Sequence, residues 1–170
     1  MSTPLKVFHL NHSDINGGAA RAAYRIHHAI RDSGIDSWMC VNVATSGDWT
    51  VAGPTSKWVK AIRHIRPHLT TPLCNLLHTG NPILHSPALV PSRWPDLLNV
   101  SDVDLVHLHW VQNEMLSIAD FGRIRKPIVW TLHDMWAFCS AEHLTSGYRW
   151  RDGYRCDNRP DYESGFDLNR

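Results

Sequence analysis

Short apolar runs alternate along the chain with segments of helical periodicity. Residues 5–10 and 37–43 are apolar runs of strand length, and between them residues 19–32 repeat their apolar positions at spacings of three and four. Gly34 then supplies the stop expected after a helix. A strand, a helix and a second strand in this order build two parallel strands of one sheet. The first 43 residues therefore predict a βαβ unit.

The same alternation returns in the second half of the chain. Residues 103–110 and 127–132 predict strands, and residues 116–124 predict the helix between them. We expect an α/β fold, a Rossmann-like three-layer domain with a mostly parallel sheet, because strands and helices alternate throughout. Residues 1–145 would form this domain, and residues 146–170, which lack sustained periodicity, would form an irregular tail.

The stretch between these two parts is less regular. Residues 44–56 contain two glycines and a proline and predict a loop, and five prolines interrupt residues 70–101. Between them, residues 56–69 carry an apolar stripe at helical spacing, with lysines and arginines around it. The favoured interpretation is a helix that packs on its own domain. A helix that lies on anionic lipid is the alternative.

Charge and cysteine content restrict the partners and the compartment. The 170 residues include 17 Lys and Arg against 16 Asp and Glu, a net charge of +1, so no global charge favours nucleic acid. The four cysteines lie far apart without a CxxC pair, which argues against a disulfide scaffold. No apolar stretch has the length of a signal peptide or of a spanning helix. We expect a cytoplasmic protein whose membrane contact, if any, is peripheral to the inner face of the plasma membrane.

Polar and aromatic side chains gather at the ends of the two later strands. His107 and His109 lie two residues apart on one predicted strand, so their side chains share a face, and Trp110 follows them. His133 and Asp134 follow the next strand. Because α/β proteins bind ligands at the carboxyl edge of the sheet, we expect these side chains to face one ligand. A histidine there can donate to a substrate hydroxyl or accept its proton.

A pair of glycines, Gly17 and Gly18, follows the first strand and opens the first helix. Glycine lets a ligand approach the backbone closely, and a helix N-terminus offers amide donors to a phosphate. Arg21, one turn into the helix, adds a basic side chain. The spaced GxGxxG pattern is absent, so the pair alone also fits a plain tight turn.

Metal binding is a competing use of the histidines. His107 and His109, together with His133 or Asp134, could supply the ligands of a metal-dependent hydrolase or deaminase. A second set of thiol and imidazole groups is Cys139, His143 and Cys156. Neither set has the compact spacing of a known zinc module, so the favoured interpretation assigns no metal ligand and no cofactor.

Three motifs resemble those of one family. They lie at residues 16–25 (NGGAARAAYR), 106–110 (VHLHW) and 127–136, which ends in TLHDMW. Together they resemble the N-terminal half of family 4 glycosyltransferases of the GT-B type, in particular those of colanic-acid and exopolysaccharide biosynthesis. The resemblance extends over most of residues 5–145, and the last motif is the most specific.

The resemblance implies an enzyme with two Rossmann-like domains that face a cleft. Such an enzyme moves a sugar from a nucleotide-diphosphate sugar to a glycan or lipid-linked acceptor, without an essential metal. The glycine pair and Arg21 would approach the donor diphosphate, and His133 with Asp134 would lie at the reacting sugar. Four residues would line the acceptor side: His107, His109, Trp110 and Trp136.

The chain departs from this family where a donor domain should follow. The paired glutamates at E-x7-E spacing have no counterpart, because the only glutamates are Glu114, Glu142 and Glu163. We therefore expect an acceptor-side domain that is inactive alone and needs a donor domain in a longer chain or in a separate subunit. Two other classes stay open: the metal-dependent hydrolase, and a non-catalytic module that docks on a membrane or a partner through residues 57–69.

Overall fold

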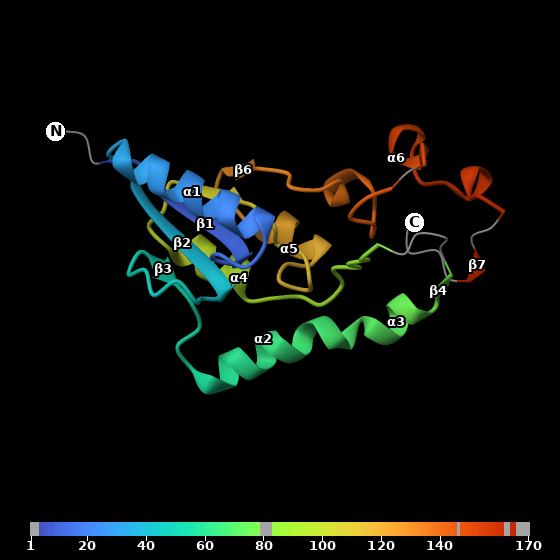
Figure 1. Cartoon of the computed structure of the whole chain (residues 1–170), viewed down its shortest axis with the longest axis horizontal. Helices are drawn as coiled ribbons and strands as arrows, with labels where there is room; N and C mark the ends of the chain where they lie inside the picture. Colours follow the sequence, from blue (N-terminus) through green and yellow to red (C-terminus); the bar gives the residue numbers. More distant parts are fainter. Residues whose placement is uncertain (1–3, 79–82, 146, 162–163, 166–170) are drawn as a thin grey trace.

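A five-stranded parallel sheet forms the centre of the structure, which we describe from a computed structural model (Figure 1). The described residues are 4–78, 83–145, 147–161 and 164–165. The strands of the sheet are β1 (Lys6–Ser13), β2 (Asp36–Val43), β3 (Val51–Ala52), β5 (Leu105–Leu108) and β6 (Ile128–Trp130). Their spatial order is β3-β2-β1-β5-β6, with all neighbours parallel. The expected α/β, Rossmann-like fold is confirmed.

The strand order places a topological switch point beside β1. From β1 the chain moves outward to β2 and β3, and it then returns to the other side of β1 to form β5 and β6. In open α/β sheets the loops diverge at such a point and leave a crevice at the carboxyl ends of the strands. The ends of β1 and β5 are therefore where a ligand site is expected.

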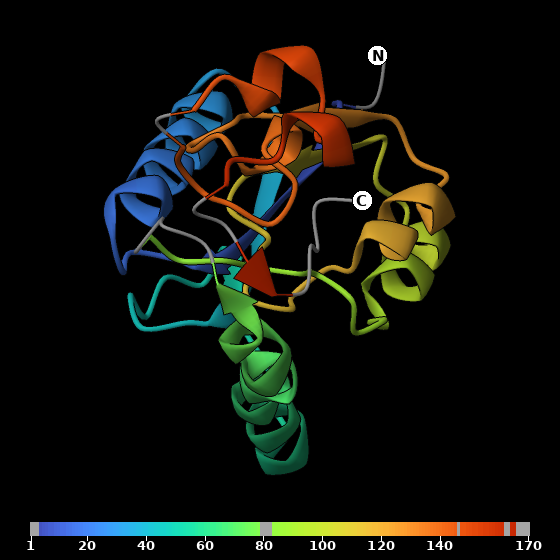
Figure 2. The same ribbon diagram turned by 90° about the vertical axis from the view of Figure 1, so that its right-hand side faces the viewer.

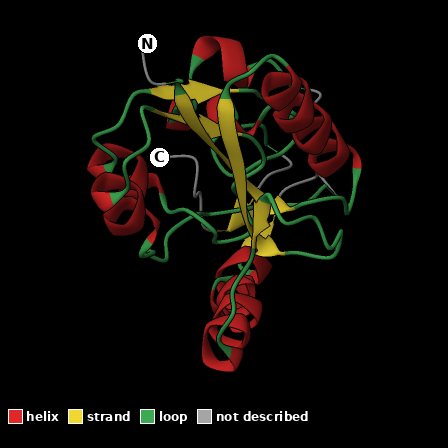
Figure 3. Cartoon of the chain, turned by 90° about the vertical axis from the view of Figure 1, so that its left-hand side faces the viewer, coloured by secondary structure: helices red, strands yellow, loops and turns green. Residues whose placement is uncertain are grey.

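Helices cover both faces of the sheet (Figure 3). On one face lies α1 (Gly18–Asp32), which buries Ala20, Ala23 and His27. On the other lie α4 (Trp94–Val100) and α5 (Ile118–Arg123). Between these two helices and the sheet is the main apolar core: Leu10, Leu98, Val103, Val106, Leu108, Val111, Met115 and Leu116. The alternation of side chains along the strands separates this core from the α1 face, where polar residues are also buried.

The predicted elements all occur, with shifted ends, and a few short ones were not expected. Strand β3 lies inside the predicted loop, where two residues are too few to give a periodic pattern. Helix α4 lies in the proline-rich segment, because Pro95 occupies the first turn, where its missing N–H does no harm. The remaining short elements are α3 (Thr71–Asn75), β4 (Leu77–His78), 3₁₀ turns at Trp136–Phe138 and Cys156–Asn158, α6 (Arg149–Asp152) and β7 (Ser164–Gly165).

Helix α2 (Lys57–Leu69) projects away from the layers of the sheet (Figures 1 and 2) and buries no residue. The expectation that its apolar stripe packs on the domain is wrong. Trp58 is 80% exposed, and Ile62, Ile65 and Leu69 are 56%, 54% and 57% exposed. Among the described residues, no helix combines the length and apolarity needed to cross a bilayer.

The side of α2 that faces the body is held by arginine rather than by apolar contact. The Arg66 guanidinium donates through Nε to the carbonyl of Glu114 (3.0 Å), through Nη1 to that of Pro91 (2.8 Å) and through Nη2 to that of Val90 (2.6 Å). Hydrogen bonds from a charged donor are about twice as strong as neutral ones. The planar guanidinium of Arg66, with its several N–H donors, therefore determines which side of α2 faces the body.

Arg63, one turn earlier, makes a second attachment. Its Nη1 donates to the carbonyl of Val41 at the end of β2 (2.9 Å), and its guanidinium lies 4.7 Å from the centroid of the Trp94 ring. A cation over an indole face adds attraction where water is partly excluded. The two arginines thus join α2 both to β2 and to the segment before α4.

Replacement of Arg66 tests this attachment. Arg66→Ala should speed hydrogen exchange of the α2 backbone amides at least about 10-fold, because hydrogen bonds from a charged group contribute about 1.5–3 kcal/mol each. Lys57→Ala, an exposed change in the same helix, is the control and should leave exchange unaltered. Equal exchange in the two variants would show that the guanidinium does not hold the helix.

Candidate functional site

The carboxyl ends of β1, β5 and β6 meet, and hydrogen bonds join the loops that follow them. The His12 amide donates to the carbonyl of Trp110 (2.8 Å), and the Trp110 amide donates to Oδ1 of Asn11 (2.7 Å). The Thr131 amide donates to the carbonyl of Leu108 (2.9 Å). The structure therefore brings the two histidine-bearing strand ends together, beside the end of the first strand.

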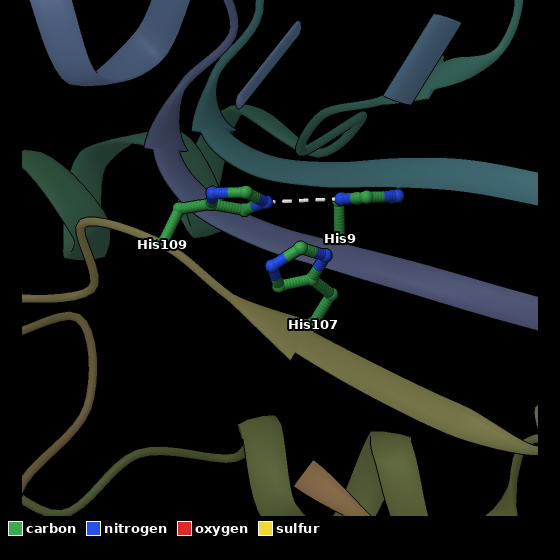
Figure 4. A group of neighbouring side chains, drawn as sticks. All are labelled: His9, His107 and His109. Atoms are coloured by element: carbon green, nitrogen blue, oxygen red, sulfur yellow. Dashed lines mark hydrogen bonds between the residues drawn. The ribbon is translucent and has the colours of Figure 1, made fainter. Parts of the chain in front are cut away.

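Three histidine rings lie packed together on the α1 face of the sheet (Figure 4): His9 from β1, and His107 and His109 from the β5 segment. We call these three residues the histidine cluster. Nδ1 of His9 lies 2.9 Å from Nε2 of His109, and the ring centroids of His107 and His109 are 4.2 Å apart. Nδ1 of His109 lies 3.2 Å from Nε2 of His133, so a line of imidazoles leads from the sheet interior to the strand end.

Burial keeps these rings uncharged. Desolvation, aided by the neighbouring imidazoles, lowers the pKa of His9 to about 3 and that of His109 to about 2. It also lowers the pKa of His107 and of His133. At neutral pH each ring therefore carries one N–H donor and one free lone pair.

Sequence reasoning misses His9, because one histidine inside an apolar strand forms no motif. Strand pairing is the signal that would have found it. In the parallel register of β1 and β5, His9 lies opposite His107. Once these two strands are recognised as neighbours, alternation places His9, His107 and His109 on one face.

Asp134 organises a second group at the same edge. Its Oδ2 accepts a hydrogen bond from Nε1 of Trp110 (2.9 Å) and lies 2.6 Å from Nδ1 of His143, and its Oδ1 accepts from the amide of Trp136 (3.0 Å). Burial alone would raise the pKa of Asp134, but the bonds from His143, Trp136 and Trp110 outweigh it and lower that pKa. The carboxylate thus fixes both tryptophans that the sequence singled out.

The first metal set proposed from the sequence is only partly assembled. His107 and His109 do lie together, and Nε2 of His133 lies 3.2 Å from Nδ1 of His109, whereas Asp134 is engaged with the tryptophans. Across the described ranges, the group of three whose ligand atoms approach one another contains His9 in place of His133 or Asp134.

The second metal set is not brought together as a described site. His143 lies between Asp134 and Oγ of Ser86 (2.8 Å), and Cys139 is a buried thiol. The side chain of Cys156 lies outside the described residues. His143 therefore belongs to the Asp134 group.

The glycine pair lies at the open start of α1. Gly17 has a φ of 96°, which favours glycine, and a Cβ added at Gly17 or Gly18 would meet no atom within 4 Å among the described residues. No described side chain caps this helix, and its first turn has no acid. Arg21 is exposed one turn further along. The geometry leaves room for an anion against the first amides of α1.

Asp14 holds the loop that leads to these glycines. The carboxylate is fully buried and accepts hydrogen bonds from the amides of Thr45 (2.7 Å), Ser46 (2.7 Å) and Ile15 (2.9 Å). Burial would raise the pKa of Asp14, and these bonds outweigh it and lower that pKa. The loops after β1 and β2 are therefore tied together beneath the glycine pair.

A cavity of about 730 Å³ lies at the carboxyl edge, between the ends of β1 and β2 and the inner side of α2. Its polar lining includes His12, Asn42, Lys60, Arg63, His64 and Asn113. The rest of the described lining is mostly apolar, including Val43, Ala44 and Ala61. Lys60 and Arg63 are its charged residues, and no aspartate or glutamate is among the described lining residues, so the charge of the cavity favours an anionic group such as a phosphate.

The cavity lies beside the predicted site rather than within it. No site residue predicted from the sequence is among its described lining residues, although the Trp110 ring lies 5.6 Å from that of His12. Sequence reasoning misses the cavity, because it forms between segments that no motif connects.

The fold and this edge define a class: a three-layer α/β protein with a basic cavity beside the switch point of its sheet. Comparisons of the chain with models of protein families, with curated proteins and with solved structures found no match. Function must therefore be argued from the geometry of the site.

Buried neutral histidines make the fold sensitive to acid. The ring nitrogens of His27 lie 2.8 Å from Oγ of Ser37 and 2.8 Å from Oγ1 of Thr50. Burial, followed by the charges of His28 and Arg31, lowers the pKa of His27 to about 4. Since the unfolded pKa is about 6.5, the unfolded state binds the proton first as the pH falls. Stability should be full above about pH 6.5 and decline toward about pH 4, by up to about 1.4 kcal/mol per pH unit for each such group.

Urea unfolding at pH 7.5, 6.0 and 5.0 measures this dependence. The free energy of unfolding should fall with each step, and His27→Gln should be less stable at pH 7.5 but should lose less on acidification. A variant with the same pH slope as the wild type would mean that His27 is not the neutral, buried group described.

Proposed function

We propose that the chain is the acceptor-side domain of a GT-B type glycosyltransferase. It would transfer a sugar from a nucleotide-diphosphate sugar to a glycan or to a lipid-linked acceptor, and the lipid-linked acceptor is the one we favour. The cavity beside the switch point, with Lys60 and Arg63 in its lining, is the observation that carries the proposal. Parallel α/β sheets bind phosphate-bearing ligands at this edge, and the glycine pair opens on the same edge.

The donor would contact the start of α1 and the end of β6. Gly17 and Gly18 leave space for a diphosphate, and Arg21 supplies a nearby cation. His133 is half-buried with Nε2 turned to His109, so it would bond to a sugar hydroxyl through Nδ1. Asp134 would act beside His133 by holding the loop that follows β6 in place.

The acceptor would enter the cavity. His107, His109 and Trp136 are buried, so in this proposal they support the wall of the site from behind. Trp110 is half-buried against His12, which lines the cavity, and would hold that side of the site in place. The cations of the cavity would bind the acceptor phosphate. A donor domain in a longer chain or in a separate subunit would complete the enzyme, and the chain alone would be inactive.

The two sides of helix α2 are the reason to favour a lipid-linked acceptor. Its inner side contributes Lys60 and Arg63 to the cavity, and its outer side presents the apolar stripe. The sequence has no acidic residue between Asp48 and Asp96, so the whole segment is cationic. Apolar side chains flanked by lysines are typical of helices that lie on anionic membranes. The protein would then work in the cytoplasm, peripheral to the inner face of the plasma membrane, and take its acceptor from that surface.

Sugar transfer by the complete gene product tests the proposal. With radiolabelled nucleotide-diphosphate sugars as donors and a membrane lipid extract as acceptor, transfer should be detected. His133→Ala should lower kcat about 10²–10³-fold, because a hydrogen bond at the reacting sugar is lost. Gly18→Ala should lower kcat/KM about 10-fold, since the added methyl group occupies space that the diphosphate needs.

Gly122→Ala is the matched control for the glycine variant. Gly122 lies in α5, and a Cβ there also meets no described atom within 4 Å. Its activity should equal that of the wild type. The proposal fails if no donor supports transfer, or if both His133→Ala and Gly18→Ala transfer sugar at the wild-type rate.

Vesicle flotation tests the membrane contact. The chain should float with phosphatidylcholine vesicles that contain phosphatidylglycerol, and less with phosphatidylcholine alone. Ile62→Ser with Ile65→Ser should reduce the amount of bound protein several-fold, because the apolar face of α2 is lost. Lys57→Glu with Lys60→Glu should also reduce it, because the attraction to anionic lipid is lost. Arg63 is left unchanged in these variants, because its bond to Val41 holds the helix.

The control is Val100→Ser, which removes an apolar side chain that is 84% exposed at the end of α4. It should float as the wild type does. Equal flotation of all variants would reject α2 as the membrane-binding surface and leave the transfer assay unaffected.

A further inference from the structure

We infer that His9, His107 and His109 form a binding site for one divalent transition-metal ion, with Zn²⁺ as the expected occupant. Such a site is additional to the proposed sugar transfer, which invokes no metal. Two features of the histidine cluster carry it: the distances between ligand atoms, and the partners of the outer ring nitrogens of His107 and His109.

The distances are close to those of a metal centre. One ring nitrogen from each of the three histidines lies within 4.8 Å of the others, and Nδ1 of His9 lies 2.9 Å from Nε2 of His109. Two nitrogens bound to Zn²⁺ at about 2.0–2.1 Å in tetrahedral geometry are about 3.4 Å apart. Side-chain rotations that move these atoms by about 1 Å are enough to place all three around an ion.

Neighbouring groups already hold the outer nitrogens of two rings. Nε2 of His107 lies 2.7 Å from Oγ1 of Thr131, and Nδ1 of His109 lies 3.2 Å from Nε2 of His133. Histidines that bind metals use one nitrogen for the ion and the other for such an orienting partner. His107 and His109 therefore keep Nδ1 and Nε2, respectively, for the ion.

His9 would bind the ion through Nδ1, the atom that lies beside His109, and its outer nitrogen would be Nε2. Its Nε2 is buried and has no hydrogen-bond partner among the described residues. If Nδ1 donates to His109, the lone pair of Nε2 is unused; if Nδ1 accepts, the Nε2 proton has no acceptor. Either tautomer leaves a buried polar atom unsatisfied, which is unfavourable.

The donor set selects the class of ion. Three neutral imidazoles without a carboxylate favour Zn²⁺, Co²⁺, Ni²⁺ or Cu²⁺ over Mg²⁺ and Ca²⁺, which prefer oxygen. An ion here would join β1 to β5, whose ligands are about 100 residues apart in the sequence, and would stabilise the centre of the sheet.

Metal titration of the chain, purified without an affinity tag and stripped with chelator, tests the site. Surface histidines are the main source of error, and His64 and His68 form an exposed pair on α2 with ring centroids 5.9 Å apart. The measurements therefore use the His64→Ala, His68→Ala background. Added Co²⁺ should bind at one equivalent per chain with the visible absorption of a tetrahedral nitrogen site, and Zn²⁺ should displace it.

Ligand replacement in that background decides the assignment. His107→Gln and, separately, His109→Gln should weaken Co²⁺ binding on the order of 100-fold or more. His28→Gln, a change of a half-buried histidine on α1, should leave binding unaltered. Circular dichroism checks the fold of each variant. Should a glutamine variant not fold, imidazole ¹⁵N shifts of the background protein decide, because Zn²⁺ must shift His9, His107 and His109 together.

Two results would overturn the inference. One is that Co²⁺ binds the wild type but not the His64→Ala, His68→Ala background, so that only the surface pair chelates metal. The other is that metal leaves the ¹⁵N shifts of the three histidines unchanged, in which case the cluster is a line of hydrogen-bonded neutral imidazoles. Neither result bears on the sugar-transfer assay, so the two proposals fail separately.

Discussion

The central strand β1 carries polar side chains into the middle of the sheet, and the surrounding loops are arranged to satisfy them. Four polar residues of β1 and the position after it are at most 5% exposed: His9, Asn11, Ser13 and Asp14. An unsatisfied polar group at such a depth is costly, so each is expected to find a partner. Those partners come from the segments after β1, β2 and β5. One strand thereby determines the shape of the whole carboxyl edge.

The same requirement explains why α2 turns its apolar side outward. Carbonyl groups of Val90, Pro91 and Glu114 lie where the helix passes, and Arg66 satisfies three of them at once. An apolar face turned inward would have displaced the guanidinium and covered these acceptors without offering them a donor. The outcome is a helix whose inner face contributes cations to a cavity and whose outer face is free for another surface.

The sequence predicts the parts of the fold that depend on local patterns. Periodicity predicts the longer strands and α1, and Gly34, the expected stop, has a φ of 86°. Parallel strands that end at one edge predict the meeting of His107, His109 and His133. The place of His9 depends instead on which strand lies beside β5. The orientation of α2, and with it the cavity, depends on carbonyl acceptors in irregular segments that have no periodic pattern. An apolar stripe in the sequence does not show whether the rest of the domain has an apolar surface for the stripe to pack on, or carbonyl acceptors that bind the neighbouring arginines instead.

The arginine attachment of α2 has a consequence for how the molecule responds to its surroundings. Guanidinium groups and backbone carbonyls do not titrate between neutral pH and mild acid, whereas the buried histidines of the sheet respond there through the unfolded state. Acid therefore acts on the two parts of one chain unequally. A drop in pH therefore weakens the layers around β1, whereas the bonds that attach α2 keep their charge state. Acid should release α2 only when the sheet that carries its acceptors unfolds.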